Sequence, residues 1–280
     1  MSQMTVGVLH PGEMGSVVGG IVRAGGARVL WASEGRSQTS RSRAEAAGLT
    51  DTGSLSALVR DSEVILSVCP PHAATDVARQ VAGQGFSGVY VDANAISPTT
   101  ARSIGVVLEP TGAPFVDGGI VGPPPSSPGT TRLYLSGSEA GRIAALFATG
   151  PMEAIVLDGP AGAASALKVA YAAYTKGTAA LLLVIRALAM KEGVDEALVK
   201  EWGRSLPDLP SRVESGLRGS VRKAWRFVSE MEESAATFAA AGLPDGFSRA
   251  AAAAYDRLAT FKNAKQTPSV ADVSTALLRR

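Results

Sequence analysis

The stretch Gly7-Val8-Leu9-His10-Pro11-Gly12-Glu13-Met14-Gly15 joins a short apolar segment to a segment with helical spacing. A strand–turn–helix of this kind presents backbone N–H groups and the positive end of a helix to a diphosphate, and glycines let the ligand approach closely. Against the pattern G-x-G-x-x-G, Gly12 and Gly15 hold the second and third glycine positions, and His10 holds the first. The stretch therefore predicts a dinucleotide site that includes His10, Gly12, Glu13 and Met14; the alternative is an ordinary glycine-rich turn.

Apolar segments rich in β-branched residues alternate with segments of helical spacing through the first half of the chain. The strands that we expect are Thr5–Leu9, Val29–Ala32, Val64–Val68, Val89–Asp92, Phe115–Asp117 and Leu133–Leu135. The expected helices between them are Gly15–Ala24, Thr39–Ala47, His72–Val81 and Glu139–Phe147. Strands that alternate with helices form a parallel sheet covered on both faces. The predicted fold class is α/β, with a Rossmann-type doubly wound parallel sheet followed by an all-α C-terminal domain.

The second half of the chain has a helical pattern throughout. Pro160 suits the first turn of a helix and Gly193 suits its C-cap, with no proline or strand pattern between them. A helix over residues 160–192 would be about 50 Å long. The later helical patterns are Asp195–Ser205, Arg212–Ala240 and Ser248–Lys262. We predict a dinucleotide-binding domain over residues 1–158 and an all-helical substrate and dimerisation domain over residues 159–280.

The long predicted helix carries apolar side chains around most of its circumference. They include Leu182, Leu183, Val184, Ile185 and Leu188. A helix that is apolar all round is buried, and a single small helical domain can hardly cover all of this surface. The pattern therefore predicts a homodimer.

Composition excludes several classes of protein. Hydrophobic residues make up 46% and charged residues 19%, which is enough for packed cores and not typical of disorder. The net charge is +2, and the cluster Arg36, Arg41 and Arg43 has no interleaved aromatics, so we expect no nucleic-acid partner. Cys69 is the single cysteine, which excludes an internal disulfide or a thiolate zinc site, and we expect no metal. The N-terminus lacks signal-peptide features and the apolar run Thr178–Ile185 is short, which predicts a cytoplasmic protein without a membrane partner.

The end of the second predicted strand bears on the choice between NAD and NADP. An acidic residue there accepts from the ribose 2′-hydroxyl of NAD, whereas a nearby arginine accommodates the 2′-phosphate of NADP. Ser33 occupies this position, and Arg36 and Arg41 follow it. Glu34 argues for NAD if its side chain turns inward, and the arginines could instead form a solvated helix face. The pattern favours NADP, with NAD as the alternative.

Four motifs, in order along the chain, resemble those of the β-hydroxyacid dehydrogenase superfamily. This superfamily includes 3-hydroxyisobutyrate and 6-phosphogluconate dehydrogenases and, as a branch, the imine reductases. Residues 12–15 resemble its G-x-M-G, and residues 92–98 resemble its D-x-S-T-x-x-P beside the nicotinamide. Residues 117–122 resemble its substrate loop D-A-P-V-S-G. Residues 162–168 resemble its G-x-G-x-x-x-K, with Lys168 at the position of the catalytic lysine.

The resemblance implies an NAD(P)-dependent dehydrogenase or reductase acting on a small molecule, together with a set of site residues. The residues implied beside the cofactor are Val68, Cys69, Pro70 and Asn94. Those implied beside the substrate are Val121, Gly122, Pro123 and Lys168. Cys69 follows directly on a predicted strand, where we expect it to line the cofactor crevice and not to act as a nucleophile.

The departures from the family leave the substrate open. Val121 replaces the serine of the substrate loop, and Tyr171 and Ala172 replace an asparagine pair after the lysine. A second lysine of the family's C-terminal domain falls at Ser229. Three polar groups that would bind a small hydroxy acid's carboxylate are therefore missing. The segment Trp225–Phe247 resembles instead a bacterial subgroup of 6-phosphogluconate dehydrogenase-like proteins with an uncharacterised C-terminal domain.

The resemblance implies that Lys168 is the proton donor or acceptor of the reaction, and its small apolar neighbours are consistent with this role. Partial burial disfavours an ammonium and can lower the pKa of such a lysine into a useful range. Tyr171 shares its face of the helix and is the second catalytic candidate. The alternative interpretations are a lysine whose head reaches solvent and a tyrosine that only packs. Lys176 points about 80° away from Lys168 and is expected to be structural.

Two further functions stay open beside a hydroxyl/carbonyl oxidoreductase. An imine reductase uses the same fold, and Tyr171 keeps this alternative open although Lys168 stands where those enzymes usually carry Asp or Tyr. A non-catalytic NADP-binding sensor is the second alternative. The acidic residues Glu230, Glu232 and Glu233 form either a solvated helix face or a contact for a cationic substrate.

Overall fold

The computed structural model describes residues 3–279, without the side chains of residues 217 and 218. Its internal contacts divide the chain into two compact units, the first ending at Lys168 and the second beginning at Val169.

The first unit is built on a sheet of eight strands in the order β3-β2-β1-β4-β5-β6-β7-β8. All neighbouring strands are parallel except β6 and β7. The strands are β1 Thr5–Leu9, β2 Arg28–Trp31, β3 Thr50–Asp51, β4 Val64–Ser67, β5 Val89–Asp92, β6 Phe115–Val121, β7 Thr131–Ser136 and β8 Met152–Val156. Strands 3-2-1-4-5-6 follow the Rossmann order, with the reversal of direction between β1 and β4. The predicted Rossmann-type sheet is confirmed, with one antiparallel pair in addition.

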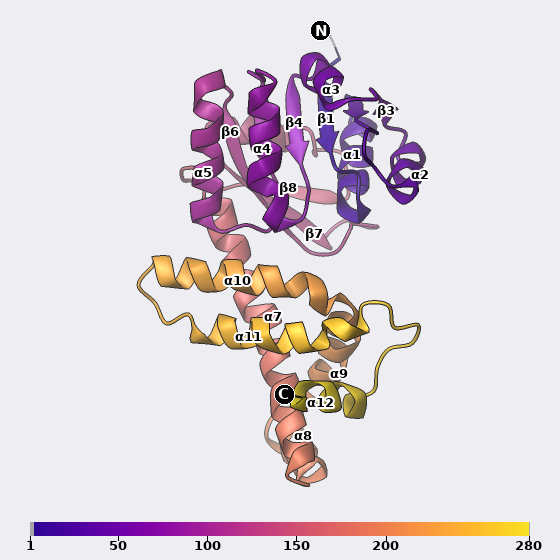
Figure 1. Ribbon diagram of the computed structural model, residues 1–280, viewed down its shortest axis with the longest axis vertical. Coiled ribbons are helices and arrows are strands. Elements are labelled where there is room, and N and C mark those ends of the chain that lie inside the picture. Colours follow the sequence, from indigo (N-terminus) through magenta and orange to yellow (C-terminus); the bar gives the residue numbers. More distant parts are fainter. Residues whose placement is uncertain (1–2, 280) are drawn as a thin grey trace. The chain divides into compact units, whose positions relative to one another are not determined.

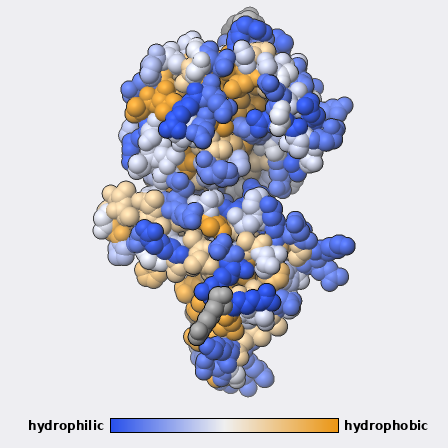
Figure 2. Space-filling model, in the orientation of Figure 1, coloured by the Kyte–Doolittle hydropathy of each residue, from blue (hydrophilic) through white to orange (hydrophobic). Residues whose placement is uncertain are grey.

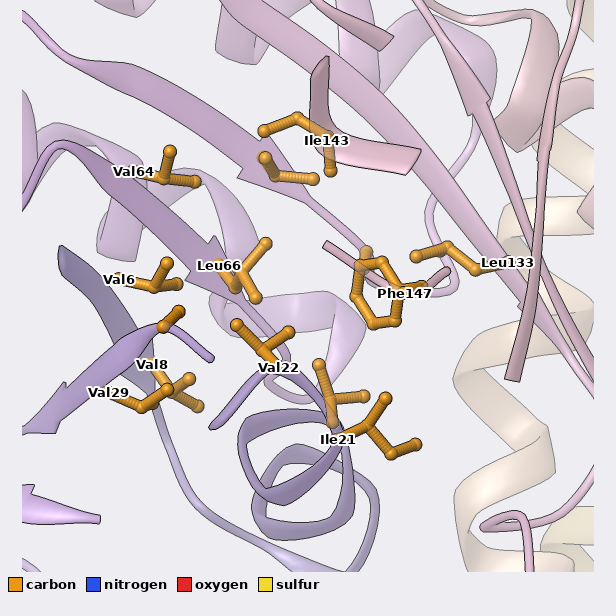
Figure 3. Close-up of a cluster of buried hydrophobic side chains, with 14 of the residues drawn as sticks. Val6, Val8, Ile21, Val22, Val29, Val64, Leu66, Leu133, Ile143 and Phe147 are labelled. Atoms are coloured by element: carbon orange, nitrogen blue, oxygen red, sulfur yellow. The ribbon is translucent and has the colours of Figure 1, made fainter. Parts of the chain in front are cut away.

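Helices cover both faces of this sheet (Figure 1). One face packs against α1 Glu13–Ala24, α2 Gln38–Ala46 and α6 Ala140–Ala145, and the other packs against α3 Leu55–Asp61, α4 Ala74–Gly83 and α5 Pro98–Leu108. Figure 3 shows the first of these cores, where Val6, Val64 and Leu66 of the strands belong to one cluster with Ile21 and Val22 of α1. Strands buried on both faces read as continuous apolar runs, which is why the sequence identified them.

The second unit is all helical. Its helices are most of α7 Ala163–Lys191, then α8 Asp195–Ser205, α9 Leu209–Ser220, α10 Ala224–Ala240, α11 Gly246–Leu258 and α12 Val270–Leu278. Short 3₁₀ turns lie at Pro71–Ala73, Glu109–Thr111, Val221–Lys223 and Ala259–Phe261. Helices α10 and α11 run side by side (Figure 1), and Phe227 meets the buried Tyr255 edge-on with ring centroids 5.3 Å apart. The predicted C-terminal helical region is confirmed.

Several boundaries differ from the sequence prediction. The stretch Arg212–Ala240, expected as one helix, is broken at Val221–Lys223, where Val221 is buried and a new helix begins. Gly219 and Ser220, both poor helix formers, precede the break. Helix α7 begins at Ala163 and not at Pro160, because Gly162 has a φ of +107° that a helix does not allow. The expected left-handed C-cap is present at Gly193, with a φ of +72°.

By length and composition alone, α7 is long and apolar enough to cross a membrane. Ala172, Ala180, Leu183 and Ala187 of this helix belong instead to the core of the helical unit. Its side chains Leu181, Val184 and Leu188 are exposed. On the face of the helical unit that Figure 2 shows, both apolar and hydrophilic side chains are exposed.

Candidate functional site

The carboxyl ends of β1, β4 and β5 meet at one edge of the sheet. In parallel register Leu9 lies beside Ser67, and Ser67 lies beside Asp92. The N–H of Val68 donates to the carbonyl of Leu9 at 3.4 Å, so the loops after β1 and β4 touch. Ligands of open α/β sheets bind in the crevice at this edge, where the strand order reverses. Most of the predicted cofactor residues follow directly on these strands.

The turn between β1 and α1 is closed by His10. His10 has a φ of +64°, a left-handed conformation in which histidine is enriched among non-glycine residues. Its carbonyl accepts from the N–H of Gly12 at 2.7 Å, and a Cβ atom at Gly15 would lie 2.5 Å from the same oxygen. A Cβ atom at Gly12 would lie no closer than 3.9 Å to any atom. Gly15 is therefore required by the turn itself, whereas Gly12 leaves open space at the start of α1.

The imidazole of His10 is neutral and incompletely paired. Burial, and then the positive charge of Arg36, lower its pKa to about 4. Its Nδ1 is buried and has no hydrogen-bond partner among the residues that the structure describes. A buried polar atom of this kind usually has a partner, so it suits a bound ligand.

A cavity of about 510 Å³ lies beside this imidazole. Its lining includes His10, Glu34 and Arg36, the apolar Leu55, and the amide side chain of Gln80. A volume of this size with apolar walls and a few polar groups is typical of small-molecule sites. With the open space at Gly12 and the unpaired Nδ1, these residues fit the nucleotide part of a dinucleotide cofactor. Of the other predicted residues, Glu13 is exposed, and Met14 packs against the core beneath α1.

The serine at the end of β2 is held by a carboxylate that the sequence prediction did not include. The N–H of Ser33 donates to Asp51 at 3.1 Å, and the N–H of Gly53 donates to the same carboxylate at 2.8 Å. Burial raises the pKa of Asp51, but these hydrogen bonds and one from the Ser33 hydroxyl outweigh it and lower the pKa. Arg41 donates to the carbonyl of Ser33 at 2.8 Å. Ser33 is thus buried within a polar network, whereas Glu34 is exposed.

Asn94 ties the ends of β4 and β5 together. Its side-chain amide donates to Asp92 at 2.8 Å and to Ser67 at 3.2 Å, and its Oδ1 accepts from the N–H of Cys69 at 2.5 Å. The backbone N–H of Asn94 donates to Asp92 at 3.0 Å. Two predicted cofactor residues, Asn94 and Cys69, are therefore in direct contact, with Val68 half-buried and Pro70 exposed beside them.

Burial raises the pKa of both titratable groups of this cluster, Asp92 and Cys69. Complete burial raises the pKa of Asp92 to about 7, against the lowering effect of the Asn94 hydrogen bonds and with a further rise from the charge of Asp117. Burial, and then Asp92, raise the pKa of Cys69 to about 12. A thiol with this pKa carries almost no thiolate at neutral pH, and the thiolate is the nucleophilic form.

Lys168 lies on the second turn of α7, where the helix passes over β6. A Cβ atom at Gly119 would lie 2.7 Å from the carbonyl oxygen of Ala164 and 3.0 Å from the Cβ of Lys168. Because Gly119 has no side chain, helix and strand come this close. Lys168 is half-buried.

The predicted substrate residues follow on the same strand. Val121 ends β6 and is 3% exposed. Gly122 has a φ of +122°, and a Cβ atom there would lie 2.4 Å from the carbonyl oxygen of Thr130. The carbonyl of Pro123 accepts from the hydroxyl of Thr131 at 2.5 Å. These contacts hold the start of the loop against β7, while Val121 offers no polar group.

The remaining candidates lie in the helical unit. Tyr171 is 48% exposed and follows Lys168 by three residues on α7. Lys176 forms an ion pair with Glu230 in which both side chains are mostly buried, and its ammonium lies 5.0 Å from the ring centroid of Phe227. Lys176 is thus structural, as expected. Of the acidic patch, Glu230 has this internal partner, while Glu232 is exposed and Glu233 half-buried.

Comparison with known proteins agrees with this geometry. Residues 189–258 match a family model described as a domain of unknown function, DUF1932. An uncharacterized 28.5 kDa protein of Methanothermus fervidus is 29% identical over 236 residues, covering 82% of this chain and 90% of that protein.

Solved structures share the fold over nearly the whole chain. The conserved protein MTH1747, of unknown function and structurally similar to 3-hydroxyacid dehydrogenases, is 28% identical, with a TM-score of 0.69 over 92% of this chain and 98% of its own. 3-Hydroxyisobutyrate dehydrogenase of Mycobacterium tuberculosis is 20% identical, with a TM-score of 0.71 over 99% and 100%. A reductive aminase of Aspergillus terreus, solved with NADPH, is 16% identical, with a TM-score of 0.57 over 97% and 98%.

The fold therefore defines the class: it is that of the 3-hydroxyacid dehydrogenases, shared with the reductive aminases and imine reductases. The resemblance to the β-hydroxyacid dehydrogenase superfamily is confirmed. Dehydrogenases and reductases are among these neighbours, and at 16–20% identity their likeness to this chain is one of fold.

Proposed function

We propose that the protein is an NADP-dependent oxidoreductase that interconverts a hydroxyl and a carbonyl on a small molecule, with Lys168 as proton donor and acceptor. The observation that carries the proposal is the approach of Lys168 to β6 at Gly119, on the strand next to the one that leads into Asn94. A hydride donor and a proton donor must be held close together for reduction of a carbonyl, and the strand ends bring the two groups of residues to one edge.

Different residues of the first unit would bind the diphosphate, the nicotinamide and the substrate. The N–H groups at the start of α1, with Gly12 and His10, would hold the diphosphate. Asn94 and the loop from Val68 to Pro70 would lie beside the nicotinamide, which supplies a hydride to the substrate carbon when it is bound in reduced form. The ammonium of Lys168 would donate the matching proton to the substrate oxygen, giving the hydroxyl, and would regain a proton from water.

NADP is proposed over NAD because cations flank the end of β2. Arg36 lines the cavity, and Arg41 lies close enough to bond the carbonyl of Ser33. A 2′-phosphate beside arginine gains charge-assisted hydrogen bonds. Asp51 opposes this preference, since its carboxylate also lies beside Ser33. We propose that the two arginines outweigh it.

Imine reduction is the second candidate function. It is favoured by the exposed Tyr171, which follows Lys168 on α7, and by the fold shared with a reductive aminase solved with NADPH. An imine needs a proton on nitrogen, and a phenol can supply it. The two candidates differ in whether Lys168 or Tyr171 carries the proton.

We further propose a cytoplasmic homodimer, with the domain boundary near residue 159. Leu181, Val184 and Leu188 on α7 are 56%, 43% and 58% exposed within a single chain. Apolar residues exposed together on one helix mark an interaction surface, and a second copy would cover them.

The test is turnover against matched substrates. Purified protein is offered NADPH with a panel of small ketones and aldehydes, and separately with cyclic imines, while oxidation of the cofactor is followed by absorbance. The proposal expects NADPH consumption with carbonyl compounds and loss of it in Lys168→Ala. NADPH binding without turnover of either panel would instead favour the sensor.

A further inference from the structure

The carboxylate of Asp117 is buried in the middle of β6, and its hydrogen bonds come from the start of α7 and from β7. Its Oδ2 accepts from the N–H of Gly162 and the N–H of Ser165, both at 2.9 Å. Its Oδ1 accepts from the hydroxyl of Ser165 at 2.5 Å. Ser136 of the neighbouring strand donates to Oδ2 at 3.1 Å and accepts from the N–H of Ala164 at 3.1 Å. Asp117 has no exposed surface.

This arrangement fixes the start of α7 to the sheet. The first N–H groups of a helix have no partner within it, and the helix dipole favours a negative charge there. Gly162, with its φ of +107°, turns the chain so that its own N–H points at the same carboxylate. A buried carboxylate is tolerated only when hydrogen bonds satisfy it, and here four hydrogen bonds do so.

The same face of β6 also receives Lys168. Asp117 and Gly119 are two residues apart on one strand and therefore share a face. Asp117 holds the first turn of α7, and Gly119 lets the second turn approach until Lys168 lies against the strand. Ser165 and Lys168 are three residues apart and lie on one side of the helix. A single helical turn therefore separates Ser165, which binds Asp117, from Lys168.

We propose that Asp117 is the positioning residue for Lys168: it fixes the helix that carries the lysine and does not touch the substrate. The inference rests on the proposed function, in which Lys168 moves the proton. A small displacement of a proton-transfer group lowers the rate of chemistry and leaves cofactor binding largely intact, since the diphosphate turn lies on another strand.

Two variants test the proposal on the full chain. Asp117→Asn removes the charge and leaves an NH₂ group facing a helix N–H, while Ser165→Ala removes only the bond from the hydroxyl. Hydrogen exchange of residues 161–169 is measured without cofactor or substrate. We expect it to accelerate about tenfold or more in Asp117→Asn, because a hydrogen bond to a charged group contributes at least that factor. A smaller acceleration is expected in Ser165→Ala, which keeps the assay usable if Asp117→Asn does not fold.

Activity then separates positioning from general stability. Both variants should lower kcat, Asp117→Asn on the order of tenfold to a hundredfold, with the NADPH dissociation constant largely unchanged. Ser269→Ala is the matched control, because it removes a helix cap at α12 in the other unit and should leave kcat unchanged. Unchanged exchange at residues 161–169, or accelerated exchange with unchanged kcat, overturns the proposal. Full activity of Lys168→Ala would instead overturn the proposed function, whatever the exchange rates show.

Discussion

Asp92 and Asp117 are register partners on the neighbouring strands β5 and β6, and neither side chain has any exposed surface. Each carboxylate holds a different part of the candidate site in place. Asp92 accepts two hydrogen bonds from Asn94 and so fixes the loop after β5, while Asp117 accepts the first N–H groups of α7. Two adjacent buried carboxylates disfavour simultaneous ionisation, and the charge of Asp117 contributes to the raised pKa of Asp92.

The first prediction concerns stability as a function of pH. The pKa of Asp92 is about 7 in the folded protein, and its ordinary value, which applies to the unfolded chain, is 3.8. Between these values the folded state holds a proton that the unfolded state has lost, so stability falls as pH rises through this window. The Asp92→Asn variant has no carboxyl group at this position, so its stability should not fall for this reason. Relative to it, the wild-type free energy of unfolding should fall by at most on the order of 4 kcal/mol from pH 4 to 7, as measured by urea denaturation.

His10 also changes the pH dependence of stability, so the free energy of unfolding must be compared between the wild type and Asp92→Asn. Its pKa is lowered to about 4, so stability due to His10 is present above its ordinary pKa of 6.5 and is lost as pH falls toward 4. This slope has the opposite sign and is the same in both proteins. If the difference in unfolding free energy between the wild type and Asp92→Asn stays constant from pH 4 to 7, Asp92 is ionised when buried.

The second prediction tests the close approach of α7 to β6. Gly119→Ala places a Cβ atom 2.7 Å from the carbonyl oxygen of Ala164, so the helix must move. We expect a loss of stability of about 1–3 kcal/mol, as for other overpacked sites, together with reduced turnover. Gly141→Ala in α6 is the control, because a Cβ atom there meets nothing within 4 Å and alanine should stabilise that helix. Equal stability of the two variants by thermal denaturation would contradict the packing.

The third prediction is a preference for NADPH over NADH. Isothermal calorimetry on the purified protein should show tighter binding of NADPH, because arginines flank Ser33. Arg36→Ala should weaken NADPH about tenfold or more and affect NADH little, since the lost contact is to the 2′-phosphate. Ser33→Asp should also weaken NADPH selectively, through repulsion of like charges. Equal affinities in the wild type would mean that Asp51 and Glu34 outweigh the arginines.

The fourth prediction is that the protein is a homodimer in solution. Light scattering at micromolar concentration should give twice the chain mass. Leu188→Glu, which places a charge on an exposed apolar position of α7, should shift the protein toward a monomer. Val106→Glu is the control, because Val106 is 60% exposed on α5 outside the proposed surface. A monomeric wild type would rule out the dimer.

The sequence predicted those parts of the fold whose signal is local. The glycines at positions 12 and 15 and the apolar strands identified the sheet and its cofactor edge. The two-residue strand β3 at Thr50–Asp51, by contrast, has too few residues for a pattern, and β8 at Met152–Val156 contains an acidic residue and is only partly buried. Helix α12 was missed, although its capping box at Ser269 and Asp272 is readable from the sequence.

The resemblance to the superfamily predicted the residues of the candidate site. It did not predict the hydrogen bonds that hold those residues in place. Asp92 and Asp117 stood in quoted motifs, but nothing in a single sequence assigns four hydrogen bonds to one carboxylate. Those bonds depend on which segments the fold brings together: Asp117 and Ser165 are 48 residues apart. Asp51 was missed for the same reason, because its contact with Ser33 joins two strands. A carboxylate within an apolar strand is the signal that could have drawn attention to Asp117.

The central claim is that Lys168 transfers the proton, and Lys168→Ala tests it most directly. The measurement is the single-turnover rate of NADPH oxidation with the best carbonyl substrate, alongside the NADPH dissociation constant. We predict a loss of at least about a hundredfold in rate with little change in cofactor affinity, because a general acid contributes about 10²–10⁴-fold. Tyr171→Phe is the internal control and should lose less. Near-full activity of Lys168→Ala, or a larger loss in Tyr171→Phe, would contradict the account, and the latter would assign the proton to the tyrosine.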